Sequence, residues 1–157
     1  RILAFLDPWA DPSGRGFQII QSQIALGSGG LFGQGLGQSK QKLFYLPAAH
    51  TDFIFSVIVE ELGIIGAIAI ISLFILLIWQ TVRIVKFNND IFLRLLSIGI
   101  VSLIALEVVI NIGVSLGIFP TKGLPLPFIS YGGSSLVFDM AAVGLLLNTS
   151  RSKDMYL

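Results

Sequence analysis

The sequence contains no cysteine and a single histidine, His50. The missing cysteines exclude disulfide bonds and thiolate metal sites, and one histidine cannot build a histidine-rich metal centre. Charge is also scarce, because charged residues make up 12% of the chain, whereas an ordinary soluble domain has about 25%. The formal net charge of +1 provides no strongly basic surface, so we expect no nucleic-acid partner.

What the chain has instead is long apolar runs, with 54% hydrophobic residues and a mean hydropathy of +0.87. Residues 62–82 carry no charge, and at about 1.5 Å per residue they are long enough to cross a hydrocarbon core of about 30 Å. Residues 95–121 hold one charged residue, Glu107, and residues 134–150 form a shorter apolar run that contains Asp139. We therefore predict an all-α, polytopic membrane protein with three transmembrane helices.

Basic residues predict the orientation of these spans. Lysine and arginine gather in residues 83–94 and 151–153, and the positive-inside rule places both segments in the cytoplasm. The predicted order is an extracytoplasmic loop with an interfacial helix (1–52), a transmembrane helix (53–82), a cytoplasmic loop (83–94), a transmembrane helix (95–117), an extracytoplasmic re-entrant loop (118–133), a transmembrane helix (134–150) and a cytoplasmic tail (151–157). The chain starts at Arg1 with neither Met nor a signal pattern, so we expect the C-terminal part of a longer protein.

Two loops interrupt the apolar runs. Residues 16–26 suit a short interfacial helix, and the six glycines in residues 27–37 would end it and let backbones pack closely. Their spacing fits neither a P-loop nor a dinucleotide fingerprint, which favours turning backbone over nucleotide binding. Residues 120–135 contain three prolines and three glycines, so no continuous helix can cross them. Irregular backbone at membrane depth needs cover from protein or a wet cavity, which predicts a re-entrant lip beside a site.

Asp52 is the acidic residue of greatest interest, because it stands alone at the mouth of an apolar helix. Helical spacing places Ser56 and Gly63 on the stripe of Asp52 and turns Glu60 away from it. A continuous helix from Asp52 through the first span would be about 46 Å long, so its first turns must project outward or line a cavity. The alternative is that Asp52 only caps this helix.

The remaining polar residues of the spans allow more than one interpretation. Glu60 and Glu61 are predicted to be a solvated pair at the top of a helix rather than a catalytic couple. Glu107, Asn111 and Ser115 recur at helical spacing and form a polar stripe, which would either line a cavity open to the outside or hydrogen-bond between helices. No role follows for Asp139.

Three blocks of sequence resemble the SEDS family of bacterial shape, elongation, division and sporulation proteins. They are residues 7–12 (DPWADP) with 33–37 (GQGLG), residues 41–47 (QKLFYLP) leading into 50–55 (HTDFIF) and 60–63 (EELG), and residues 120–135 (PTKGLPLPFISYGGSS). The Thr-Lys-Gly form at 121–123 is similar to the FtsW/SpoVE-like branch rather than to the RodA-like elongation branch. The resemblance covers nearly the whole chain and implies the last third of a bundle of about ten helices.

The resemblance implies a peptidoglycan glycosyltransferase that polymerises lipid II, an undecaprenyl-pyrophosphate-linked disaccharide peptide, on the outer face of the bacterial cytoplasmic membrane. Asp52 takes the place of the family's essential acidic residue, whereas Ala48 and Phe44 stand where many or some members have Glu. The implied partners are a class B penicillin-binding protein transpeptidase and other divisome membrane proteins. The fragment alone is expected to be inactive, because the lipid cavity would lack its other walls.

The residues themselves fit sugar transfer. One positioned carboxylate can accept the proton of the attacking hydroxyl, and Asp52 is the predicted general base. The leaving pyrophosphate needs cationic stabilisation more than a proton donor. The predicted substrate-binding and pyrophosphate-binding residues are Lys42, Lys122, Lys40, Arg15, His50, Ser130, Tyr131, Gly132, Gly133 and Ser134. A weak site for Mg²⁺ or another divalent cation, made by Asp52 and substrate phosphates, is left open.

Two other functions stay open at this point. A lipid flippase or transporter is supported by the intramembrane carboxylates Glu107 and Asp139 and by the broken segment at 120–135. A non-catalytic scaffold that positions a partner enzyme would retain its role after Asp52 is neutralised. Catalysis would depend on Asp52, transport would depend on Glu107 and Asp139, and a scaffold would tolerate the loss of Asp52.

Overall fold

The computed structural model describes residues 7–10, 16–38, 53–121 and 123–151. Within these ranges the chain forms a short 3₁₀ turn and four α-helices, with no β-strand. They are η1 (Pro8–Ala10), α2 (Phe17–Ser28), α4 (Ile54–Phe87), α5 (Ile91–Ser115) and α6 (Gly133–Arg151). The described part of the chain is therefore all-α, as the long apolar runs predict.

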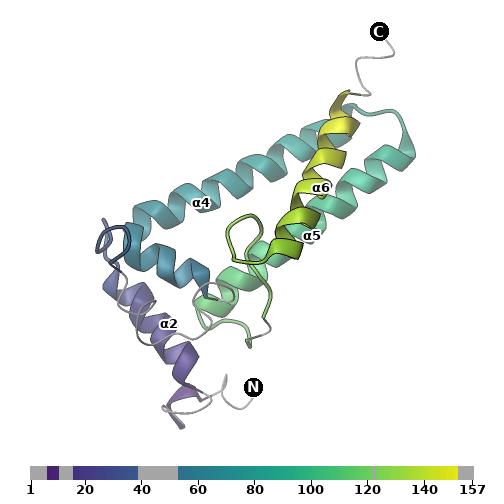
Figure 1. Cartoon of the computed structure of the whole chain (residues 1–157). Coiled ribbons are helices and arrows are strands. Elements are labelled where there is room, and N and C mark those ends of the chain that lie inside the picture. Colours follow the sequence, from purple (N-terminus) through teal and green to yellow (C-terminus); the bar gives the residue numbers. More distant parts are fainter. Residues whose placement is uncertain (1–6, 11–15, 39–52, 122, 152–157) are drawn as a thin grey trace.

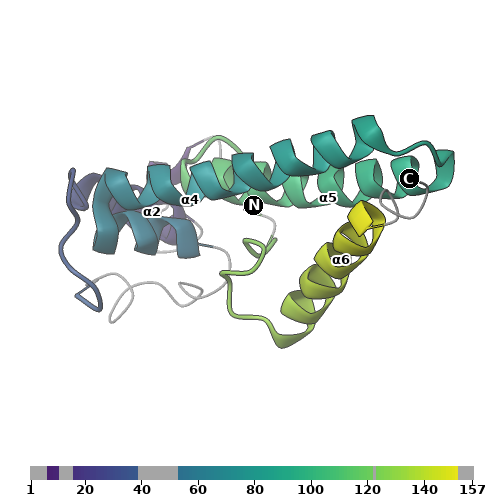
Figure 2. The same ribbon diagram turned by 90° about the horizontal axis from the view of Figure 1, so that it is seen from above.

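The frame of the structure is a long antiparallel pair formed by α4 and α5 (Figure 1). Helix α6 lies across α5 and diverges from the pair towards its own N-terminal end (Figure 2). Both α4 and α5 are long and apolar enough to cross a membrane, and among the described residues α6 does not meet the same test. Helix length and composition thus support two of the three predicted spans, α4 and α5. The third span, α6, stays a prediction.

The connection between α4 and α5 is shorter than the sequence predicts. Helix α4 continues to Phe87 rather than ending at residue 82, and α5 begins at Ile91 rather than at residue 95. Asp90 is the N-cap of α5, and its Oδ1 accepts a hydrogen bond from the Phe92 N–H at 2.8 Å. Because the cap satisfies a backbone donor that the first turn leaves free, the helix can start within the charged segment.

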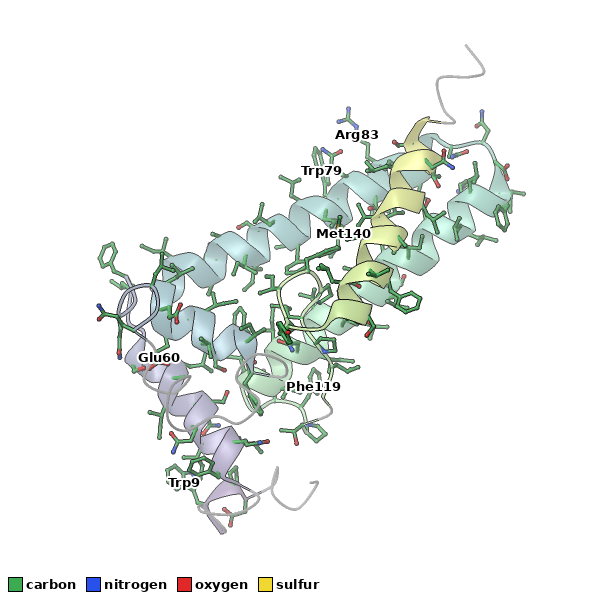
Figure 3. The ribbon with its side chains drawn as sticks, in the orientation of Figure 1. Trp9, Glu60, Trp79, Arg83, Phe119 and Met140 are labelled. Carbon is green, nitrogen blue, oxygen red and sulfur yellow. The ribbon has the colours of Figure 1, made fainter. Side chains whose placement is uncertain are left out.

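The end of α4 near this connection has an aromatic residue with a cation over it. The Arg83 guanidinium lies 5.9 Å from the centroid of the Trp79 ring, which is within the range of a cation–π contact. Figure 3 shows both side chains on the outer side of α4 near the connection. Trp and Arg are typical of membrane–water boundaries, so this contact agrees with a helix end at such a boundary.

Helix α4 is sharply bent at Gly63, which has non-helical φ/ψ angles of 69° and −169°. The bend divides α4 into a first arm (residues 54–62) and a second arm (residues 64–87), and the two arms fold back on one another in Figure 1. The prediction of one continuous helix of about 46 Å is therefore wrong. A positive φ is open to glycine at no steric cost, which explains why the bend falls at Gly63.

Residues 29–35, which we call the glycine loop, satisfy the backbone groups that the bend leaves free. Two N–H groups of the loop donate to carbonyl groups of the first arm, and two N–H groups of the second arm donate to carbonyl groups of the loop. The pairs are Gln34 to Glu60 (2.9 Å), Gly35 to Glu61 (3.1 Å), Ile64 to Gly30 (3.0 Å) and Ile65 to Leu31 (3.4 Å). A broken helix in an apolar setting needs such partners, because each unpaired buried backbone group is costly.

Helix α2 packs against the first arm of α4 and the end of α5, and buries Ile19, Ile20, Ser22 and Ala25. The Ser22 hydroxyl lies 2.7 Å from the Ser56 hydroxyl and donates to the Ser115 carbonyl at 2.8 Å. Three small side chains at this crossing let the helices approach closely. The helix predicted at 16–26 is thus present, with one face buried against protein rather than against lipid alone.

Candidate functional site

Part of the predicted site lies outside the described residues. Those residues are Asp52, His50, Lys40, Lys42, Arg15 and Lys122. The described part comprises the start of α4, the stripe on α5 and residues 116–132, which we call the α5–α6 loop. Residue 122 of this loop is outside the description.

The start of α4 is fixed by a buried aromatic residue. Phe53 is 0% exposed and packs in one cluster with Val57 and Val114, so the first arm begins against the C-terminal end of α5. Phe53 occupies the N-cap position and makes no side-chain capping bond. Asp52 lies outside the described residues, so its capping of this helix stays a prediction.

The α5–α6 loop turns back along the helices instead of staying beyond their ends. Leu126 is buried in one cluster with Phe74 of α4 and Ile104 of α5. Ile104 lies about three turns before the end of α5, which is about 16 Å along the helix axis. The loop thus reaches towards the middle of the α4–α5 pair (Figure 1), which is the geometry that a re-entrant segment requires.

Two hydrogen bonds between Leu126 and Ser130 close the tip of this loop on itself. The Leu126 N–H donates to the Ser130 Oγ at 2.7 Å, and the Ser130 N–H donates to the Leu126 carbonyl at 3.0 Å. The Ser130 hydroxyl is thus used within the loop. Its predicted part in pyrophosphate binding stays a prediction.

Two further side chains, one from each flanking helix, hold the loop backbone. Asn111 of α5 donates from Nδ2 to the Leu124 carbonyl at 2.7 Å. Asp139 of α6 accepts a hydrogen bond from the Phe128 N–H at 3.3 Å. Phe128 has a φ of 64°, a backbone conformation that bulky residues rarely adopt, so the loop is held in a strained shape.

The end of the loop and the first turn of α6 present the other predicted binding residues. Tyr131 is 84% exposed, Gly133 and Ser134 are exposed, and Gly132 is half-buried. Helix α6 begins at Gly133, so Ser134 lies in its first turn, where backbone N–H groups are free. Free N–H groups at a helix N-terminus suit an anionic group, which is consistent with the predicted role of these residues.

A cavity of about 440 Å³ lies between α5 and α6. It is lined by Ile100, Leu103, Ile104, Glu107, Ser135, Phe138, Asp139 and Ala142. Glu107 and Asp139 therefore face the same space from two helices. Within the described residues, no group of three or more histidine, aspartate or glutamate side chains could hold a metal ion.

The predicted polar stripe on α5 is divided among three environments. Glu107 lines the cavity, Asn111 is 1% exposed against the α5–α6 loop, and Ser115 lies at the crossing with α2. The Ser115 hydroxyl is buried and has no hydrogen-bond partner among the described residues. For the Asn111 side chain the geometry agrees with the alternative of hydrogen bonding between segments. At Ser115 the group bonded across the crossing is the backbone carbonyl.

The prediction of a solvated glutamate pair is wrong for Glu60. Its side chain is 1% exposed, because the glycine loop and α2 cover the first arm of α4 where Figure 3 labels it. Glu61 is half-buried. The glycine-rich stretch was the available signal, since closely packed backbone next to α4 would remove solvent from this end of the helix.

Sequence reasoning also missed the role of Asp139. The signal was its position, because an acidic residue in an apolar helix needs a polar partner nearby. The preceding irregular segment supplies that partner as a backbone N–H.

The chain matches the cell cycle protein family FtsW/RodA/SpoVE over residues 1–155. It is 58% identical over 150 residues to a probable peptidoglycan glycosyltransferase FtsW of Geobacter sp. (strain M18), covering 96% of this chain and 41% of the relative. It is 56% identical over 151 residues to stage V sporulation protein E of Bacillus subtilis (strain 168), covering 96% of this chain and 41% of the relative.

Two solved structures are also similar. A chain from a peptidoglycan synthase complex, studied for its coordination of polymerization and crosslinking, aligns with a TM-score of 0.75 at 33% identity and covers 98% of this chain and 41% of that one. A mutant of the rod shape determining protein RodA of Thermus thermophilus aligns with a TM-score of 0.65 at 35% identity, covering 84% and 40%. The present chain spans about two fifths of the length of these relatives.

Proposed function

The chain belongs to the FtsW/RodA/SpoVE family of cell cycle proteins, and on this premise we propose that it is the C-terminal part of a peptidoglycan glycosyltransferase. The chain is an all-α, polytopic membrane protein of this family. The observation that carries the proposal is the relative named a probable peptidoglycan glycosyltransferase, 58% identical over 96% of this chain. Lipid II is the proposed substrate, and the outer face of the bacterial cytoplasmic membrane is the proposed place of reaction.

The proposed reaction is a displacement at the anomeric carbon of the donor sugar. The acceptor 4-hydroxyl oxygen attacks this carbon, a new glycosidic bond forms, and the bond from the carbon to the lipid pyrophosphate breaks. Asp52 accepts the hydroxyl proton as general base, which contributes about 10²–10⁴ in rate. The electron pair of the broken bond leaves with the lipid pyrophosphate.

Cationic side chains stabilise the leaving pyrophosphate in this proposal, because it departs as an anion. Lys42 precedes Asp52 in sequence and Lys122 belongs to the α5–α6 loop, and Lys40 and Arg15 belong to the predicted outer segment 1–52. The exposed first turn of α6 supports the proposal, since its free N–H groups favour negative charge.

A class B penicillin-binding protein transpeptidase and other divisome membrane proteins are the proposed partners. The support is a similar solved chain that comes from a peptidoglycan synthase complex. Such an assembly would join strand polymerisation to crosslinking at one place on the membrane.

The proposed function is tested with the full-length protein, purified with its transpeptidase partner and supplied with lipid II. We expect wild type to make glycan strands on a resolving gel and Asp52→Asn to lose at least about 100-fold in rate. Asp90→Asn is the matched control, because Asn caps a helix as well as Asp does and residue 90 caps α5 at the opposite end of the pair.

The strands made by the two proteins test the role of Asp52 separately from the polymerase activity. Strands from Asp52→Asn at the wild-type rate would move the base elsewhere. Strands from neither protein, while an unrelated polymerase works on the same lipid II, would reject the proposed activity.

A transporter is the second candidate, because Glu107 and Asp139 line the same cavity between two helices. Ionisable residues that face a cavity inside a membrane mark ion or substrate pathways in transporters. This function predicts that Glu107→Gln abolishes lipid translocation in vesicles and that Asp52→Asn spares it. We expect the reverse, with strand synthesis by Glu107→Gln within about threefold of wild type, since a Gln keeps the volume and polarity of the cavity wall.

A further inference from the structure

The geometry points to Asn111 and Asp139 as positioning residues that hold the α5–α6 loop in its working shape by hydrogen bonds of opposite direction. Asn111 donates to the loop from α5, and Asp139 accepts from the loop on α6. The inference rests on the proposed function, because the loop carries the residues to which pyrophosphate binding is assigned. Neither side chain touches the reacting atoms in this account.

The Asn111 contact is made by a buried side chain. The side chain is 1% exposed, and its Nδ2 lies 2.7 Å from the Leu124 carbonyl oxygen, which is a short hydrogen bond. An amide in an apolar helix is costly unless it is paired, and so is a carbonyl group that turns back towards the middle of the bundle. The hydrogen bond pairs the Nδ2 donor with the Leu124 carbonyl, so the start of the loop is fixed to α5.

The Asp139 contact fixes the other half of the loop. The side chain is 6% exposed, and its Oδ2 lies 3.3 Å from the Phe128 nitrogen. Phe128 has a φ of 64°, and a strained conformation persists only where the surroundings hold it. The buried neighbours Leu126 and Pro127 and the Asp139 carboxylate together hold this residue in place.

The two contacts differ from a general packing role because they act on one short stretch of the loop. The tip between residues 126 and 130 is already closed by two hydrogen bonds between Leu126 and Ser130. Asp139 holds this tip to α6 at Phe128, and Asn111 holds the backbone just before it to α5 at Leu124, so the stretch cannot shift along either helix alone. Its exposed end, Tyr131, is thereby set relative to both helices, and a displacement of about 1 Å in a positioning element can cost about 100-fold in rate.

The two hydrogen bonds run in opposite directions, which gives a test. An exchange between amide and carboxylate side chains should be harmful at residue 111 and tolerated at residue 139. Asn111→Asp replaces the Nδ2 donor by a carboxylate, which in its ionised form only accepts and cannot bond to the Leu124 carbonyl. Asp139→Asn keeps an oxygen that can accept from the Phe128 N–H. If the charge of Asp139 were what matters, Asp139→Asn would instead be as harmful as Asp139→Leu.

The experiment uses the full-length protein with its transpeptidase partner, and compares Asn111→Asp, Asp139→Asn, Asp139→Leu and the control Asp90→Asn with wild type. We measure kcat and KM for lipid II, the thermal midpoint, and hydrogen exchange at the amides of residues 124–130. We expect Asn111→Asp to lose about 10–100-fold in kcat/KM. We expect Asp139→Leu to lose about 10-fold, less than Asn111→Asp because its hydrogen bond is longer, and Asp139→Asn to stay within about threefold.

Hydrogen exchange at the amides of the loop gives a measurement that does not depend on activity. Amide exchange in residues 124–130 should rise in Asn111→Asp and Asp139→Leu and stay near wild type in Asp139→Asn, because local opening follows the loss of these bonds. Equal damage by Asp139→Asn and Asp139→Leu would overturn the inference. So would a lower thermal midpoint with unchanged KM, kcat and loop exchange.

Failure of the proposed function looks different. In that case wild type makes no strands while an unrelated polymerase does, and the exchange pattern of the loop still supports or overturns the positioning of the loop itself.

Discussion

Single glycines determine how closely the backbone segments approach at the bend of α4. A Cβ on Gly63 would overlap backbone atoms of Leu31 and Gly33, and the positive φ at Gly63 disfavours any other residue. We therefore expect Gly63→Ala to destabilise the full-length protein by more than about 1–3 kcal/mol, the cost of the backbone conformation alone. Thermal unfolding in detergent measures this change.

Gly99→Ala is the matched control, because Gly99 lies inside α5 and a Cβ there meets nothing within 4 Å among the described residues. We expect this change to be neutral or to stabilise by about 0.5–1 kcal/mol, since Ala is the better helix former. An equal loss of stability in both variants would contradict the explanation given for Gly63.

At the scale of single residues, the sequence predicts the properties of a side chain better than it predicts the burial of that side chain. The glycines of residues 27–37 were predicted to allow close backbone packing, and this is confirmed at Gly29 and Gly33, where a Cβ would overlap backbone atoms of α4. Glu60 was predicted to be solvated and is buried, because its cover comes from a loop about 30 residues earlier in the chain. Burial depends on tertiary contacts that a local pattern does not contain.

At the scale of elements, the crossing of α2 with α4 depends on a shared hydrogen bond between Ser22 and Ser56. We expect Ser22→Ala and Ser56→Ala each to cost about 0.5–1.5 kcal/mol. The double variant should cost less than the sum by at least about 0.5 kcal/mol, because either change removes the same bond. A double-mutant cycle on thermal stability measures this coupling.

Ser150 provides the comparison for that cycle. Its hydroxyl donates to the Leu147 carbonyl within α6, at 2.7 Å. The costs of Ser150→Ala and Ser56→Ala should add within about 0.5 kcal/mol. Coupling as large as that of the Ser22 pair would show that the cycle reports a general loss of stability.

The elements themselves were largely predictable, since apolar runs of sufficient length indicate helices at the positions of α4, α5 and α6. The bend of α4 was not, because an isolated glycine in an apolar helix is normally tolerated. What converts Gly63 into a break is the glycine loop, which supplies hydrogen-bond partners that only the folded chain brings near. The path of the α5–α6 loop was predicted only as irregular backbone, and its contacts with Asn111 and Asp139 required the structure.

At the scale of the whole molecule, the predicted orientation places the α4–α5 connection and the glycine loop on opposite sides of the membrane. Single cysteines at Asn89 and Gln38, both exposed, report this in a full-length protein without other cysteines. We expect an impermeant maleimide to label Gln38→Cys in intact cells and Asn89→Cys only after permeabilisation. Labelling of Asn89→Cys in intact cells would invert the orientation.

Many large apolar side chains of α4, α5 and α6 are exposed, among them Leu73, Leu106 and Val137. The chain covers about two fifths of its relatives, and the helices in the described part of the chain leave these faces uncovered. Lipid and the remaining helices of the full-length protein are the surroundings that an exposed apolar helix face requires. No sequence pattern within this chain distinguishes the two surroundings, since both are apolar.

The glycine loop also has a consequence for how the protein is made. Ribosomes elongate chains at about 5–20 residues per second, so residues 29–35 are synthesised about 2–6 s before residues 60–65. A helix forms within about a microsecond, far faster than the chain grows. The arms of α4 therefore emerge when their hydrogen-bond partners at the bend already exist. A circular permutant in which the glycine loop follows α4 would reverse this order. Helix α4 would then enter the bilayer before the hydrogen-bond partners of its bend were synthesised.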